Sequence, residues 1–258
     1  MKQKISVEAM MEAGMHFGHQ THRRNPKMDP YIFDARSGIH IIDLTKSMPM
    51  LEKALEFVGQ TASEGKQILF VGTKKQAGVI IKAQATACGM PYVDERWMGG
   101  LLTNFDTLKK RLKYLRELDE KYSKDDFGDM TKKERVELDR VYKSLNFTMG
   151  GLRDLKSLPA VVFVASVLQD AIAVREAKKL KLPVVAMVDT NADPTSVTYP
   201  IPSNDDAKKA IDYVIGLMAE ACSAGKVPTK AVVEEKKEET TGIEPELVAN
   251  IEKGNDGS

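Results

Sequence analysis

Four short apolar runs constrain the fold of this chain more than any other feature. They are rich in valine and isoleucine without polar alternation, and they cover residues 68–71, 92–93, 160–164 and 184–188. Such runs are typical of parallel strands that are covered on both faces. Stretches with helical periodicity alternate with them, at about 46–63, 76–88, 170–180 and 204–221. This alternation predicts an α/β fold with a doubly wound, mainly parallel sheet.

Residues 105–149 interrupt this alternation. Apolar side chains there recur at spacings of three and four residues, namely Phe105, Leu108, Leu112, Leu115, Leu118 and Tyr122. A turn-like segment follows, and a capping box at Thr131–Glu134 then begins a second periodic stretch, whose apolar face carries Leu138, Val141 and Leu145. Two such helices joined by a short turn predict an antiparallel helical hairpin, packed as a coiled coil and inserted into the sheet domain.

The predicted domains follow from these patterns. The sheet domain is discontinuous and comprises residues 1–104 and 150–225, with the hairpin at 105–149. From residue 226 to residue 258 the chain has five lysines against eight acidic residues and few apolar ones. A segment of this composition cannot bury enough apolar surface to fold alone, so we expect a disordered acidic tail.

The segment Arg96–Asn104 joins the predicted sheet to the hairpin. It contains Trp97, the only tryptophan, and a Gly-Gly pair that matches a second pair at the other root, Gly150-Gly151. Thr103 to Asp106 resembles a capping box at the start of the first hairpin helix. For Trp97 we favour a core anchor at the hairpin root, and the alternative is an exposed stacking surface.

Composition excludes several classes of protein. No apolar run reaches the length of about 18 residues that a membrane-spanning helix needs, and the first residues lack the apolar stretch of a secretory signal. The only cysteines, Cys88 and Cys222, form no C-x-x-C pair, so we expect free thiols in a reducing cytoplasm. The net charge of +1 conceals an asymmetry, because the residues before Lys226 carry 33 basic and 29 acidic side chains. This modestly basic balance permits contact with nucleic acid without demonstrating it.

Basic residues follow the first apolar run in the loop Gly72–Lys75. A glycine and lysines at the start of a helix would present N–H groups and positive charge to a phosphate. The loop is not a P-loop, because no second glycine stands at the required spacing. The alternatives are a contact to nucleic-acid phosphates, which we favour, a mononucleotide site, or a solvated basic cap.

Histidines and carboxylates form two further candidate groups. His16, His19 and His22 are spaced three residues apart and precede a basic stretch. These histidines could contact RNA or a partner protein, have structural roles in the fold, or bind a metal. Asp189 and Asp205 follow late apolar runs, where α/β proteins bind ligands, although such residues also form turns and helix caps. One hypothesis is that His19, Asp189 and Asp205 hold a structural divalent ion, Zn²⁺ or Mg²⁺.

The order of the motifs supports one family. The chain resembles bacterial small-subunit ribosomal protein two over residues 4–224, in the segments 16–21, 25–28, 39–43, 68–74, 96–104, 182–191 and 204–206. The resemblance implies a flavodoxin-like sheet with an inserted helical hairpin. It also implies a cytoplasmic ribonucleoprotein component of translation, bound to 16S rRNA in the 30S subunit, on which small-subunit protein one docks. The segment Ala165–Asp170 departs from the acidic, proline and basic residues common there.

Our first hypothesis is therefore a non-enzymatic rRNA-binding scaffold, a structural constituent of the ribosome, with no required cofactor, small-molecule substrate or membrane. The expected phosphate contacts are Arg23, Arg24, Lys27, Lys74, Lys75, Arg96, Lys110 and Arg111. The rival hypothesis is an α/β enzyme or nucleotide sensor that uses Asp189, Asp205 and the Gly72–Lys75 loop. It requires a pocket in which these groups converge.

Overall fold

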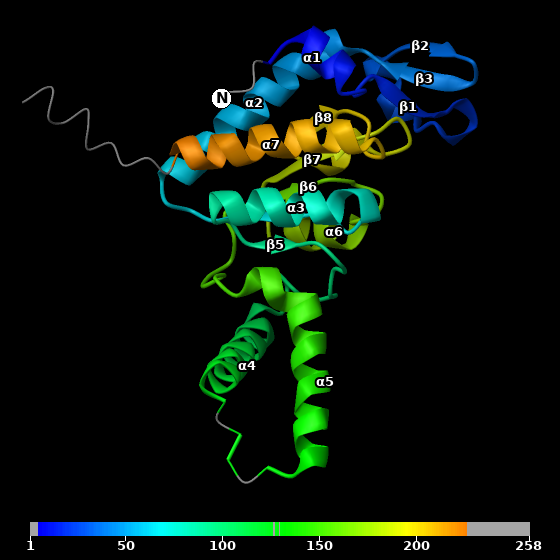
Figure 1. The fold of residues 1–258 in the computed structure, drawn as a ribbon. Helices are drawn as coiled ribbons and strands as arrows, with labels where there is room; N and C mark the ends of the chain where they lie inside the picture. The colour runs from blue at the N-terminus through cyan, green and yellow to red at the C-terminus, as the bar shows by residue number, and fades with distance from the viewer. Residues whose placement is uncertain (1–4, 126, 129, 226–258) are drawn as a thin grey trace, which may run out of the picture. The chain divides into compact units, whose positions relative to one another are not determined.

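The computed structural model describes residues 5–125, 127–128 and 130–225. Its main element is a sheet of five parallel strands in the order β5-β4-β6-β7-β8 (Figure 1). The strands are β4 (Ile68–Val71), β5 (Tyr92–Val93), β6 (Val161–Val164), β7 (Val184–Val188) and β8 (Tyr199–Pro202). The predicted α/β class and the four predicted strands are confirmed. The strand order is that of flavodoxin-like folds, in which the chain starts inside the sheet and winds outward in both directions.

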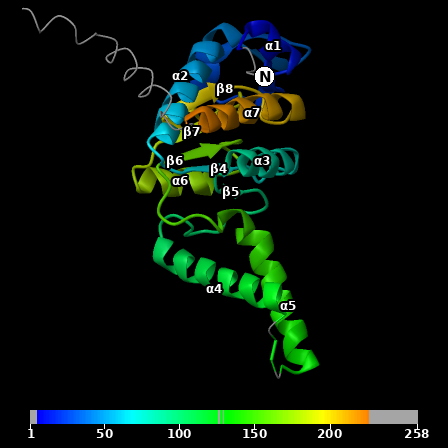
Figure 2. The same ribbon diagram turned by 60° about the vertical axis from the view of Figure 1, so that its left-hand side comes forward.

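Helices cover both faces of this sheet, as the unalternating strands predicted. On one face lie α1 (Val7–Glu12), α2 (Leu44–Ser63), α3 (Lys75–Cys88) and α7 (Lys208–Gly225). The other face packs against α6 (Ala171–Lys179; Figure 2). It also packs against the segment that contains Trp97, Leu101 and Leu102. Successive strand residues point to opposite faces, so Phe70 and Phe163 enter the first core whereas Leu69 and Val162 enter the second.

A second, smaller sheet, which the sequence analysis did not predict, precedes the main sheet in the chain. It is antiparallel, in the order β1-β3-β2, with β1 (Phe17–Gln20), β2 (Ile32–Arg36) and β3 (Ile39–Ile42). A Cβ added to Gly18 would lie 2.5 Å from Cγ2 of Thr190, just after β7. Glycine therefore lets β1 approach the end of the main sheet closely. Short 3₁₀ turns, η1 (Thr21–Arg23) and η2 (Pro26–Tyr31), join β1 to β2.

Two helices, α4 (Phe105–Lys124) and α5 (Lys132–Met149), lie between β5 and β6 in the chain. The predicted seam of α4 is confirmed, because its leucines are buried while the residues between them are exposed. The ring of Tyr122 stacks on Tyr142 with 4.3 Å between centroids, and the Tyr142 hydroxyl donates to Asp119 at 2.8 Å. Val141, expected on the packed face of α5, is 39% exposed. A coiled coil along the whole length of the pair stays a prediction.

Helix starts test the predicted capping boxes. The box at Thr131–Glu134 is confirmed, with both reciprocal bonds present. The box at Thr103–Asp106 is wrong, since Asn104 precedes α4 and caps it with no side-chain bond. The predicted tail, 226–258, falls outside the described residues. In the part of the chain that is described, no helix has both the length and the hydropathy to cross a membrane.

Candidate nucleic-acid interface and polar cluster at the carboxyl edge

Charged side chains from the loops after β4, β7 and β8 meet at the carboxyl edge of the main sheet. The Lys74 ammonium, which follows β4, lies 2.7 Å from Asp205 Oδ1 and 2.9 Å from Asp206 Oδ1, which follow β8. Parallel strands bring the loops after their carboxyl ends to one edge, which explains how residues so distant in sequence meet. Lys74 and Asp205 are largely buried, so the ion pair is shielded from solvent screening.

His19 joins this polar cluster from β1. Its Nδ1 lies 3.0 Å from Asp189 Oδ2, and its Nε2 lies 3.2 Å from Asp206 Oδ2. The hydrogen bond to Asp189 raises the pKa of His19, and the charges of all three carboxylates add to this effect, whereas burial opposes it. Both ring nitrogens face acceptors, an arrangement that favours the protonated imidazolium.

The cluster brings together the three residues of the metal hypothesis, but in different roles. Ligand atoms of His19, Asp205 and Asp206 lie within 4.8 Å of one another. Asp189 instead contacts the other ring nitrogen of His19, the position from which a carboxylate orients a metal-binding histidine. Burial raises the pKa of Asp205, and the Asp189 charge adds to this, while Lys74 opposes it. Lys74 is thus the cation that already balances the cluster.

The loop Gly72–Lys75 binds a carboxylate of the protein itself, that of Asp170. The N–H and hydroxyl groups of Thr73 donate to the Asp170 carboxylate at 3.3 and 2.8 Å. In phosphate-binding α/β proteins such donors, after the first strand, face the ligand. Burial raises the pKa of Asp170 to about 6, against the opposing bonds from Thr73. A mononucleotide phosphate would have to displace this carboxylate, which argues against the nucleotide-sensor hypothesis.

The basic residues expected to contact phosphate differ in their surroundings. Lys27 pairs with Asp193 at 2.6 Å, and Arg24 pairs with Asp29 at 3.3 Å. Lys74 lies inside the polar cluster. Within the described ranges, no salt bridge engages the five other candidates, all exposed: Arg23, Lys75, Arg96, Lys110 and Arg111. These five present positive charge that the described residues do not neutralise.

Trp97 is buried, as we favoured, and its partner was not foreseen from the sequence. The indole Nε1–H donates to Glu176 of α6 at 3.1 Å, and the Thr103 hydroxyl donates to the same carboxylate at 3.1 Å. The second bond explains why Thr103 does not cap α4. One signal in the sequence could have revealed Glu176, which shares the apolar stripe of α6 with Ala173 and Ala177. A charged residue on a buried stripe requires a polar partner.

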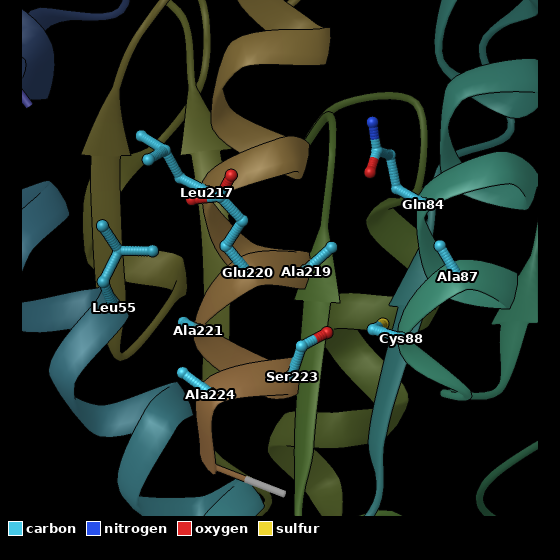
Figure 3. Close-up of a pocket in the computed structure, with 10 residues that line it drawn as sticks. All are labelled: Leu55, Gln84, Ala87, Cys88, Leu217, Ala219, Glu220, Ala221, Ser223 and Ala224. Atoms are coloured by element: carbon cyan, nitrogen blue, oxygen red, sulfur yellow. The ribbon is translucent and has the colours of Figure 1, made fainter. Parts of the chain in front are cut away.

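One hollow on the described surface lies away from these groups. It has a volume of about 510 Å³, and residues of α2, α3 and α7 line it, among them Leu55, Cys88 and Leu217 (Figure 3). Cys88 ends α3 and Ala224 lies near the end of α7, whereas the polar cluster lies near the beginning of α3. The pocket that the enzyme hypothesis required, with Asp189, Asp205 and Lys74 converging on open space, is not this one.

Comparison with known proteins identifies the family. The family model described as ribosomal protein S2 matches residues 10–225. A small ribosomal subunit protein uS2 from Bifidobacterium longum is 47% identical, with 96% of this chain and 90% of the relative aligned. The protein of the same name from Dehalococcoides mccartyi is 46% identical over 92% of this chain and 98% of its own length, and that from Roseiflexus sp. is 48% identical over 86% and 84%. The chain belongs to the ribosomal protein S2 family, which consists of structural proteins rather than enzymes.

Proposed function

We propose that this protein is a structural constituent of the small subunit of the bacterial, cytoplasmic ribosome, where it binds 16S rRNA and neighbouring ribosomal proteins. Family membership and the small-subunit names of its relatives support the subunit assignment. The observation that carries rRNA binding is the set of five exposed basic side chains without salt bridges to described residues. Such side chains neutralise phosphates and read the shape of folded RNA with little base-specific contact.

Arg96, Lys110 and Arg111 are the most testable part of this interface. Arg96 precedes the Trp97 segment, and the other two lie in the second turn of α4. We expect the R96Q/K110Q/R111Q variant to bind a 16S rRNA transcript more weakly, with a salt slope lower by about one for each phosphate that is no longer neutralised. The matched control is K53Q/K82Q/K209Q, which removes three exposed lysines, none in a salt bridge with a described residue, from α2, α3 and α7. Equal weakening in both variants would refute this assignment.

Assembly is the second part of the proposal. We expect the protein to co-sediment with 30S particles and to support the docking of small-subunit protein one. Particles reconstituted without this chain should retain less of protein one after sedimentation, and adding the chain back should restore it. Undiminished retention of protein one would contradict the docking proposal while leaving rRNA binding intact.

A divalent ion at the polar cluster is a separate proposal. The nitrogen of His19 and the oxygens of Asp205 and Asp206 form a donor set that suits Zn²⁺ better than Mg²⁺. Because binding requires loss of the His19 proton, Zn²⁺ affinity should rise with pH. Titration calorimetry of the wild type and of H19N tests this, with H22N as the control, since His22 lies outside the cluster. Equal Zn²⁺ binding by the wild type and H19N would exclude the site.

A further inference from the structure

Glu176 receives more hydrogen bonds than any other described carboxylate. Its Oε1 accepts from Trp97 Nε1–H at 3.1 Å and from Gly100 N–H at 2.7 Å. Its Oε2 accepts from Leu102 N–H at 3.0 Å, and from the N–H and hydroxyl groups of Thr103, both at 3.1 Å. Burial raises the pKa of Glu176, but these bonds outweigh burial and lower it, so the carboxylate is charged at neutral pH.

These bonds give the segment Trp97–Thr103 its shape. Three backbone N–H groups converge on one carboxylate, which makes the segment an anion-binding nest whose anion comes from α6. Gly100 has a φ of +87°, a conformation that residues with a side chain seldom adopt. Leu101 and Leu102 are buried beside the nest. Without the charge on Glu176, the converging amides would be desolvated without an adequate acceptor.

Exposed basic side chains flank the nest in the sequence on both sides. Arg96 precedes it directly, while Lys110 and Arg111 follow it in α4. Because no side chain caps the first N–H groups of α4, the bonds that Leu102 and Thr103 donate to Glu176 are what ties the residues just before its first turn to α6. The direction in which α4 leaves the sheet, and with it the separation of these basic groups, therefore depends on the nest.

We propose that Glu176 is a positioning residue for RNA binding, which holds Arg96 and the first turns of α4 in the arrangement that contacts rRNA phosphates. This inference rests on the proposed rRNA-binding function. Glu176 itself touches no RNA in this arrangement, because its carboxylate is buried and points into the nest. Its effect on affinity must therefore pass through the basic side chains.

A double-mutant cycle measures this dependence. E176Q keeps the shape of the side chain but replaces one oxygen with an amide nitrogen, which cannot accept the bonds of the nest. We expect E176Q to weaken binding to a 16S rRNA transcript about tenfold and to lower the salt slope by about one to two. In the R96Q/K110Q/R111Q background, E176Q should change affinity by less than about twofold, because the groups through which it acts are gone.

The controls separate positioning from general destabilisation. I215A creates a cavity in α7, in the core on the other face of the sheet, and leaves the nest intact. Binding is measured at a temperature at which circular dichroism shows every variant folded, and T103A replaces E176Q in the cycle if E176Q does not fold. A loss of affinity that is equal in both backgrounds, or no larger than that of I215A, would overturn the inference. A wild type without salt-dependent binding would instead reject the proposed function, and this inference with it.

Discussion

Two glycines in helix interiors should respond in opposite ways to the same substitution. Gly59 lies in α2 and Gly78 lies in α3, and neither has a positive φ, so alanine suits the backbone at both positions. A Cβ on Gly59 would meet its nearest atom, the Ala221 oxygen, at 3.7 Å, which is ordinary contact. A Cβ on Gly78 would lie 2.6 Å from the backbone oxygen of Asp94. The predicted difference between G59A and G78A comes from that one close approach.

The magnitudes follow from two opposing effects. Replacing glycine with alanine inside a helix stabilises a protein by about 1 kcal/mol. Overpacking costs about 1–3 kcal/mol, and the upper end applies to Gly78 because a backbone oxygen cannot rotate away as a flexible side chain can. We therefore expect G59A to raise the free energy of unfolding by about 0.5–1 kcal/mol. G78A should lower it by about 2 kcal/mol, since α3 must move away from the segment after β5.

Urea unfolding of the full-length chain, followed by circular dichroism at 25 °C, measures both effects. For a slope of about 2 kcal/mol per molar urea, the midpoint of G78A should fall by about 1 M while that of G59A rises slightly. A G78A variant as stable as G59A would refute the reasoning, because it would mean that α3 and Asp94 are not in close contact. Lowered stability in both variants would show instead that the helix-propensity argument fails here.

Three further predictions concern a helix cap and two titrating groups. T131A removes the bond that the Thr131 hydroxyl accepts from the Glu134 N–H, while the Thr131 N–H still donates to Glu134. It should lower the melting temperature through a loss of about 1 kcal/mol, whereas S123A, outside any box, should not. The pKa of His19 is raised in the folded state, so its stabilisation is complete below the unfolded value of 6.5 and is lost as pH rises through the folded pKa. H19N should therefore abolish a fall in melting temperature as pH rises above 6.5, and an unchanged pH profile would contradict the ion pairs of His19. Asp170 has its pKa raised to about 6, so its ionisation destabilises the fold as pH rises from about 4 through 6. D170N should flatten that decline, which calorimetric melting curves at several pH values would detect; a decline as steep as in the wild type would refute the assignment.

Much of the main sheet was predictable because its strands have a strong local signal. Val161–Val164 and Val184–Val188 are uniformly apolar, and short runs of this kind are typical of parallel strands that are covered on both faces. β8 was missed because Tyr199–Pro202 contains two prolines, which ordinarily argue against a strand. β1 was missed because Phe17–Gln20 is short and half-exposed, and its strand conformation depends on pairing with β3.

The polar cluster was partly predictable. Asp189 and Asp205 follow strands or loops that parallel topology brings to one edge, and the hypothesis that His19 joins them agrees with the observed contacts. The role of Lys74 was not predictable, because a lysine after a strand equally suits a phosphate or a carboxylate. Only the fold places Asp205 2.7 Å from its ammonium.

The sequence alone determined the α/β class, the strands with uniform apolar runs, the seam of α4 and the family resemblance, since each depends on residues close together in the chain. The tertiary structure decided which charges pair. Glu176 is separated from Trp97 by 79 positions, and Asp170 from Thr73 by 97. Local propensity carries no information about such distant partners. Burying a carboxylate costs free energy unless the fold places hydrogen-bond donors around it. In this protein the donors to Glu176 come from the loop after β5, and the donors to Asp170 come from the loop after β4.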